Sequence, residues 1–107
     1  MSLLAFFDEV DKDEVKSLIK RYRGQMVLHS YLYYVLDKPI WSDDKWQEVA
    51  DKLTQLQVTH PDCCKVKYYD KQFADWSGDT GMHLDKSLKV QLWANYILRV
   101  NDEQTKN

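Results

Sequence analysis

The sequence predicts an all-α fold: a helical hairpin with a short N-terminal helix, an irregular connection and a C-terminal helix packed on the hairpin. Apolar residues recur at steps of three and four, which is the period of helices with one buried face. Pro39 interrupts this pattern and is incompatible with a continued helix. The 107 residues suffice for one core, so we expect a single domain, residues 1–107, with the hairpin at about 11–62 and a divergent extension at about 63–100.

The first part of the chain predicts a short helical turn and then a long helix. Residues 2–7 are mostly apolar and are expected to cover part of the core. Asp11, with Glu14 three residues later, predicts the cap of a helix that ends near Leu36. Gly24 costs about 1 kcal/mol relative to alanine in such a helix and marks a bend or a close contact. A solvated basic face, rather than a phosphate site, is predicted for Lys16, Lys20, Arg21 and Arg23.

After the break at Pro39, Ser42 predicts the cap of a second helix, with two acidic residues at its positive end. Trp41 and Trp46 occupy the two positions that close over each other in a hydrophobic staple. This helix is expected to end near residue 60. Its apolar stripe consists of Trp46, Val49, Ala50, Leu53 and Leu56.

The C-terminal part is less regular. Residues 65–69 are compatible with a short strand or an extended loop, and Phe73 and Trp76 are expected to anchor this region to the helices. The run of turn-forming residues at 75–81 predicts a structural turn. A last helix is expected from a cap at Asp85 to about Val100, with a buried stripe of Leu88, Leu92, Trp93, Tyr96, Ile97 and Val100.

The composition excludes several classes of protein. Hydrophobic residues make up 44% of the chain and charged residues 30%, and the formal net charge is −2. These values are typical of a folded, soluble domain and argue against disorder and against direct nucleic-acid binding. No apolar run has the length of a membrane span, and the N-terminus does not resemble a signal peptide, so we expect no membrane association and a cytoplasmic location.

Residues with reactive side chains do not form a recognisable catalytic set. Cys63 and Cys64 are adjacent and are expected to be reduced, structural thiols. His29, His60 and His83 lack the spacing of a zinc site or of a catalytic triad, and we expect structural roles for all three. We therefore predict neither an enzyme nor a metal site.

One pattern between residues 31 and 62 is more specific. Two tyrosines precede an aspartate, a proline and a second aspartate at a helix start, and that helix closes with a leucine, three residues and a His-Pro pair. These residues are Tyr33, Tyr34, Asp37, Pro39, Asp43, Leu56, His60 and Pro61. The order resembles the N-terminal Ia domain of the bacterial NAD-dependent DNA ligases, in which a helical hairpin carries such a motif.

In that family the Ia domain binds the nicotinamide mononucleotide half of NAD and orients the pyrophosphate for attack by a lysine of the adjacent adenylation domain. A pyridinium ring favours aromatic faces, and carboxylates can hold ribose hydroxyls and the carboxamide. The resemblance implies that the nicotinamide-contacting positions are Tyr33, Tyr34, Asp43 and Trp46.

Two positions depart from the family pattern. Lys45 stands where the family usually has glutamate, and Gln47 stands where it has a carboxylate that contacts the nucleotide. Losing an anion and gaining a cation beside a cationic ring weakens attraction by about 1 kcal/mol per screened contact. The resemblance therefore implies that binding of nicotinamide mononucleotide or NAD is weak or lost, and no cofactor is required.

Three functional hypotheses follow. The first is a non-catalytic, stand-alone module that resembles the Ia domain. The second is a protein interaction module, with a protein partner or a second copy docking on the hairpin, because residues 26–36 are apolar on almost every side. The third is a fragment that completes a split NAD-dependent ligase in trans. Small ligase-like fragments of this kind fit a phage or other mobile-element setting.

Overall fold

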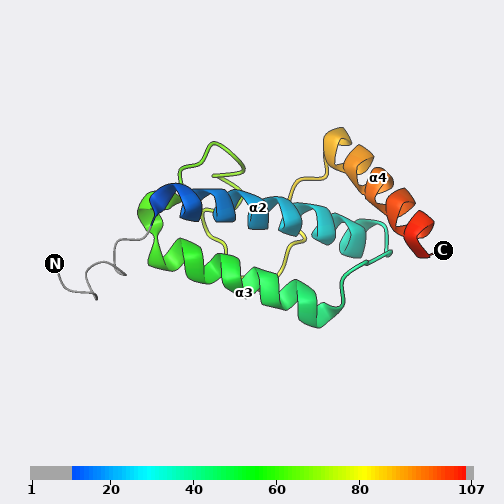
Figure 1. Ribbon diagram of the computed structural model, residues 1–107, viewed down its shortest axis with the longest axis horizontal. Coiled ribbons are helices and arrows are strands. Elements are labelled where there is room, and N and C mark those ends of the chain that lie inside the picture. The colour runs from blue at the N-terminus through cyan, green and yellow to red at the C-terminus, as the bar shows by residue number, and fades with distance from the viewer. Residues whose placement is uncertain (1–10, 106–107) are drawn as a thin grey trace.

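The computed structural model describes residues 11–105, so the short helix expected at residues 2–7 lies outside the described residues. The chain forms helix α2 (Lys12–Ser30), the π-helical turn η1 (Tyr31–Val35), helix α3 (Asp43–Thr59), the 3-10 turn η2 (Pro61–Cys63) and helix α4 (Leu88–Thr105). Between residues 11 and 105 no strand occurs, and the predicted all-α class is confirmed. Helices α2 and α3 lie side by side and antiparallel, and α4 lies beyond the C-terminal half of α2 (Figure 1).

Local caps set the starts of both hairpin helices. The Asp11 carboxylate accepts hydrogen bonds from the backbone N–H groups of Asp13 at 3.0 Å and of Glu14 at 3.3 Å. The Ser42 hydroxyl accepts a hydrogen bond from the backbone N–H of Lys45 at 3.1 Å. Each cap satisfies donors that the first turn of a helix leaves free. The two predicted helix starts are confirmed.

The first helix ends in a widened turn. The backbone N–H of Leu36 donates to the carbonyl of Tyr31 at 3.2 Å, a step of five residues rather than four. Asp37 then adopts a left-handed φ of 52°, a conformation that aspartate tolerates better than most residues. The helical segment therefore stops at Val35, close to the end that Pro39 predicts.

Apolar residues near the end of this first helical segment form the centre of the core. Met26, Val27, Leu28 and Leu32 are buried between the helices. The apolar character of residues 26–36 was the reason to expect a docking surface on the hairpin. The buried positions show that most of this apolar surface is used internally, although Val35 remains partly exposed.

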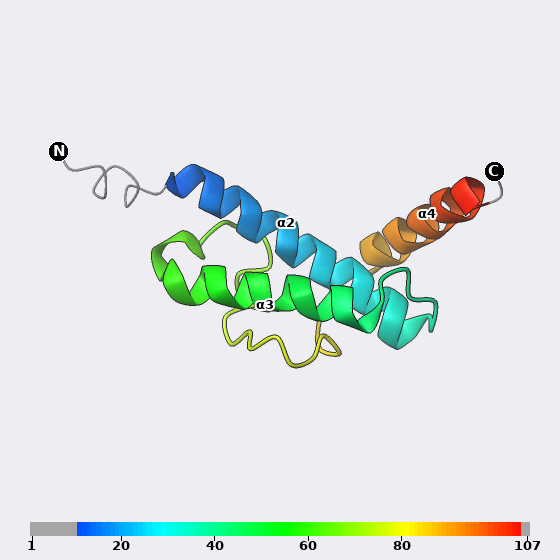
Figure 2. The ribbon, with the colours of Figure 1, turned by 60° about the horizontal axis from the view of Figure 1, so that its bottom comes forward.

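The connection between α3 and α4, residues 64–87, returns along the hairpin, and part of it passes beneath α3 in the view of Figure 2. Phe73 and Trp76 are buried, with ring centroids 4.9 Å apart, so the predicted anchors are confirmed. Residues 65–69 form a loop rather than a strand. Lys67 and Tyr69 have left-handed φ angles of 58° and 57° there.

Arg23 is a correction to the expected solvated basic face. Its side chain is only 1% exposed. Its guanidinium donates to Asp70 Oδ1 at 2.7 Å, to the carbonyls of Cys64 and Tyr68 at 3.0 Å each, and to Gln57 Oε1 at 2.9 Å. A planar group with five donors can satisfy such a ring of acceptors. Arg23 therefore fastens the connection to α2.

Helix α4 differs from the prediction in its start and in its buried face. Asp85 caps the turn before the helix by accepting the backbone N–H of Ser87 at 2.9 Å, and α4 itself begins at Leu88. Val90 and Ala94 are buried. Three members of the predicted stripe are instead exposed, by 65%, 60% and 54%: Leu88, Leu92 and Tyr96. The helix carries two apolar stripes, and periodicity alone cannot tell which one meets α2.

Candidate functional site

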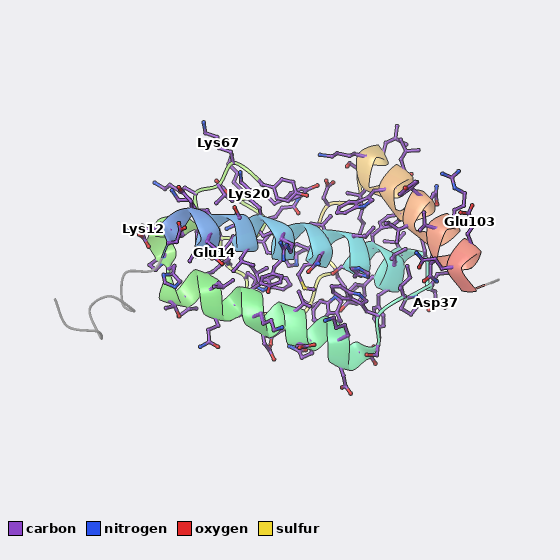
Figure 3. All side chains as sticks on the ribbon, in the orientation of Figure 1. Lys12, Glu14, Lys20, Asp37, Lys67 and Glu103 are labelled. Atoms are coloured by element: carbon purple, nitrogen blue, oxygen red, sulfur yellow. The ribbon has the colours of Figure 1, made fainter. Side chains whose placement is uncertain are left out.

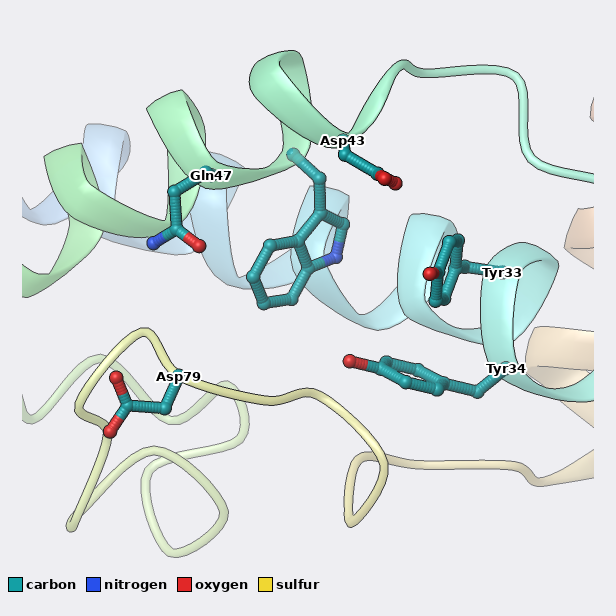
Figure 4. A pocket seen from close by; sticks show the side chains of 6 residues that line it. Tyr33, Tyr34, Asp43, Gln47 and Asp79 are labelled. Atoms are coloured by element: carbon teal, nitrogen blue, oxygen red, sulfur yellow. The ribbon is translucent and has the colours of Figure 1, made fainter.

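A cavity of about 170 Å³ lies where the end of the first helical segment meets the start of α3. All four residues that the family resemblance marks line it, together with two others. We call this cavity the aromatic cleft. Its lining residues are Tyr33, Tyr34, Asp43, Trp46, Gln47 and Asp79 (Figure 4).

The two tyrosines form one wall of the aromatic cleft. Tyr33 and Tyr34 lie in the π-helical turn, and their rings meet edge to face with centroids 4.8 Å apart. The Tyr34 hydroxyl accepts a hydrogen bond from the Thr80 hydroxyl at 3.4 Å. Single π turns inside helices are uncommon and are often found at functional sites. Sequence periodicity contained no sign of this turn.

Asp43 is the first residue of α3, directly after the Ser42 cap, and its side chain is exposed. It points from the helix start toward Tyr33 (Figure 4). A carboxylate at this end of a helix is stabilised by the helix dipole and by nearby N–H groups. Asp43 therefore places a negative charge at the rim of the aromatic cleft.

Trp46 is held from behind by the buried Ser30. Its indole N–H donates to the Ser30 hydroxyl at 3.2 Å. The connection passes directly over this contact at Gly81, where an added Cβ would lie only 2.1 Å from the Ser30 hydroxyl oxygen. The position of the indole therefore depends on contacts from α2 and from the C-terminal connection.

Trp41 has a different partner from the one predicted. Its ring stacks on His29, with centroids 3.6 Å apart and an interplanar angle of 8°. The Trp46 ring contacts Trp76 instead, with centroids 6.3 Å apart, so the two indoles expected to form a staple pack against separate rings. Burial lowers the pKa of His29 to about 4, and its Nδ1 has no hydrogen-bond partner among the residues that the structure describes. His29 is thus a neutral packing residue behind the site at pH 7.

The two residues that depart from the family pattern have structural contacts. Lys45 does not line the cleft: its ammonium lies 3.5 Å from a Glu48 carboxylate oxygen and 5.8 Å from the centroid of the Trp41 ring. The Gln47 amide donates to Asp51 Oδ1 at 2.9 Å and to the Gly78 carbonyl at 3.1 Å. Gln47 therefore ties the connection to α3 next to the cleft.

Asp79 is the lining residue that the sequence analysis did not identify. It lies on the loop that faces α3 across the cleft (Figure 4), and it accepts a hydrogen bond from the Ser77 hydroxyl at 3.0 Å. The turn-forming residues around it correctly indicated a turn. Nothing in that local pattern indicates which helix the turn approaches.

The lining has a clear electrostatic character. It contains three aromatic rings, two carboxylates and an amide, and no lysine, arginine or histidine. Such a set suits a flat organic cation, because the ring faces and the carboxylates both attract positive charge. It does not suit a metal ion, and the described residues contain no cluster of three potential metal ligands.

None of the helices described is long and apolar enough to cross a membrane.

Comparisons with known proteins agree on the N-terminal half of the chain. A family model described as "DNA ligase-like, N-terminal NAD+-binding domain" matches residues 12–68. Among curated relatives, a DNA ligase of Thermosipho africanus is 34% identical over 53 residues, which is 50% of this chain and 8% of that protein. A DNA ligase of Syntrophomonas wolfei is 40% identical over 48 residues, covering 45% and 7%. The chain thus spans less than a tenth of these relatives, and no solved structure matches it.

Proposed function

Because the chain belongs to the family of DNA ligase-like, N-terminal NAD+-binding domains, we propose that it binds the nicotinamide mononucleotide half of NAD weakly and catalyses no ligation itself. The observation that carries the proposal is the aromatic cleft. Four residues line one cavity at the surface, and they are the ones that the resemblance marks for nicotinamide: Tyr33, Tyr34, Asp43 and Trp46. The aromatic rings and carboxylates that line the cleft suit a pyridinium ring, which is flat and positively charged.

Five of the six lining residues contact the ligand in this proposal. The pyridinium ring packs against the tyrosine rings and the indole, because the faces of these neutral rings carry partial negative charge. Asp43 supplies a counter-charge and an acceptor for ribose hydroxyls. Asp79, from the connection beyond the matched residues, supplies a second carboxylate on the opposite side. Together these contacts select a cation over a neutral ring.

Weak affinity follows from the size and the charge of the cleft. A cavity of about 170 Å³ is below the usual range of roughly 300–1,000 Å³ for sites that bury a whole ligand. Gln47 contributes no charge, because its amide is engaged with Asp51 and Gly78. We therefore expect a dissociation constant on the order of 1 mM, which corresponds to about 4 kcal/mol of binding free energy.

A titration followed by NMR tests the proposal. Nicotinamide riboside, which is cationic and lacks phosphate, is expected to shift the signals of Tyr33, Asp43 and the Trp46 indole N–H at millimolar concentration. Asp43→Asn should weaken binding by about two- to fivefold, which corresponds to a partly exposed charge contact. Asp44→Asn is the matched control, because Asp44 is in the same first turn but does not line the cleft. No shift at the three reporter residues would contradict the proposal.

A protein interaction module is the second candidate function. The specific observation that favours it is the exposed apolar stripe of Leu88, Leu92 and Tyr96 on α4, because exposed apolar patches often mark interaction sites. Cross-linking and light scattering, with Leu92→Glu as the variant and Gln55→Glu, at an exposed position of α3, as the control, test it. A strictly monomeric protein that recovers no cross-linked partner counts against this function.

A further inference from the structure

A second concave surface lies on the side of α2 that faces away from α3. It is a groove of about 590 Å³ formed by α2, the loop at residues 66–68 and α4, and it shares no lining residue with the aromatic cleft. Lys20 and Lys67 lie on this side of α2 in Figure 3. The volume is within the range of small-molecule sites. We call it the anion groove, for the reasons that follow.

The charge of the groove is opposite to that of the cleft. Lys20, Arg21 and Lys67 line it, and no carboxylate does. None of these three side chains forms an ion pair within the described part of the chain. Two acidic residues of the adjoining connection are already engaged, Asp70 by a buried guanidinium and by backbone N–H groups, and Asp85 by a tyrosine hydroxyl. Three cations that form no ion pair with any residue between 11 and 105 therefore line one groove.

The floor of the groove is aromatic. Tyr68 and Trp93 approach α2 at Gly24, where an added Cβ would lie 3.1 Å from the Tyr68 hydroxyl oxygen and 3.6 Å from the Trp93 ring. The absence of a side chain at position 24 lets both rings pack close to the helix. Gln25 adds an amide donor beside them. A flat ring can stack on such a floor regardless of its substituents.

We propose that the anion groove binds a nucleoside phosphate. The phosphate lies among Lys20, Arg21 and Lys67, where charge-assisted hydrogen bonds to its oxygens are available. The base packs against Tyr68 and Trp93. The groove and the cleft thus bind ligands of opposite charge. The carboxylates of the cleft attract a cationic ring, and the lysine and arginine side chains of the groove attract an anionic phosphate ester.

The four tryptophans provide separate reporters for this proposal, because Trp93 lines the groove and Trp46 lines the cleft. In an NMR titration, adenosine 5′-monophosphate is expected to shift the Trp93 indole N–H and to leave that of Trp46 unchanged. Adenosine and inorganic phosphate, each offering half of the ligand, should bind at least about fivefold more weakly, since each loses either the ion contacts or the stacking. A short single-stranded oligonucleotide is the fourth ligand to be titrated.

Charge-reversal variants complete the test. Lys20→Glu and Lys67→Glu should each weaken binding of adenosine 5′-monophosphate by about fivefold or more, whereas Lys38→Glu, an exposed lysine outside the groove, should have no effect. Tighter binding of the oligonucleotide, lost in the same variants, supports the proposal with nucleic acid as the source of the phosphate. Equal shifts with adenosine and its monophosphate, or unchanged affinity in both groove variants, would overturn it.

Discussion

Replacing Arg23 by methionine should remove a large part of the stability of this domain. Methionine retains much of the apolar volume of the side chain but none of its donors. The change abolishes four hydrogen bonds of 2.7–3.0 Å and leaves the acceptors of Cys64, Tyr68 and Asp70 without this partner. Arg23→Lys keeps the charge but cannot reproduce the planar fork.

The magnitude follows from what remains after the change. Removing one partner of a buried ion pair typically costs about 3–5 kcal/mol. Asp70 moderates this cost because its side chain is 35% exposed and keeps hydrogen bonds from the backbone N–H groups of Val66 and Lys67. The bonds to the Cys64 and Tyr68 carbonyls are only part-buried, so water can replace the lost donor and each carbonyl adds about 1 kcal/mol. We expect a loss of about 3–4 kcal/mol for Arg23→Met, a large fraction of the roughly 5–15 kcal/mol typical of a folded domain.

Urea unfolding followed by tryptophan fluorescence and by circular dichroism measures this loss. The control is Arg21→Met, since Arg21 precedes Arg23 by two residues on α2 but is exposed, and it should change the free energy of unfolding by less than about 0.5 kcal/mol. Arg23→Lys should fall between the two. A loss below about 1 kcal/mol for Arg23→Met, or equal losses at both positions, would refute the role assigned to the buried guanidinium.

Three further variants test other parts of the structure. Gly81→Ala places a Cβ 2.1 Å from the Ser30 hydroxyl oxygen and should cost about 1–3 kcal/mol in thermal unfolding; an unchanged melting temperature would contradict this close contact. Burial lowers the pKa of His29 to about 4, so the unfolded state binds more protons between about pH 4 and 6.5, and stability should fall as the pH drops through this window. His29→Phe should remove up to about 3 kcal/mol of that fall; parallel curves for wild type and variant would argue against it. Gln47→Glu cannot donate to the Gly78 carbonyl and should destabilise the domain by about 1–2 kcal/mol; urea unfolding identical to wild type would exclude this tether.

The sequence predicted the features that depend on neighbouring residues. The helix starts at Asp11 and Ser42 and the break at Pro39 arise from side chains that act on backbone groups within three or four positions. The meeting of Tyr33, Tyr34, Asp43 and Trp46 was also within reach, because a short loop forces antiparallel helices to bring adjacent ends together. The motif and this geometry place those side chains at one end of the hairpin.

Features that depend on distant partners were not predictable in the same way. The acceptors of the Arg23 guanidinium are 34 to 47 positions away in the chain, and an arginine with the same local neighbours on an isolated helix would be solvated. Helix α4 carries an apolar stripe on two sides, so its buried face was decided by packing on α2. Asp79 reached the aromatic cleft only because the connection folds back over the hairpin.

Gln47 and Asp79 illustrate how a departure from the family pattern acquires a structural role in this fold. A glutamine at position 47 removes a carboxylate from α3, but its amide gains two donors, and one of them bonds the carbonyl of Gly78. Gly78 has a φ of 82° and directly precedes Asp79, so the tether holds the turn that carries Asp79. Asp43 and Asp79, from two distant segments of the chain, are then the two carboxylates that line the cleft, and Gln47 adds no charge of its own to attract a cationic ring.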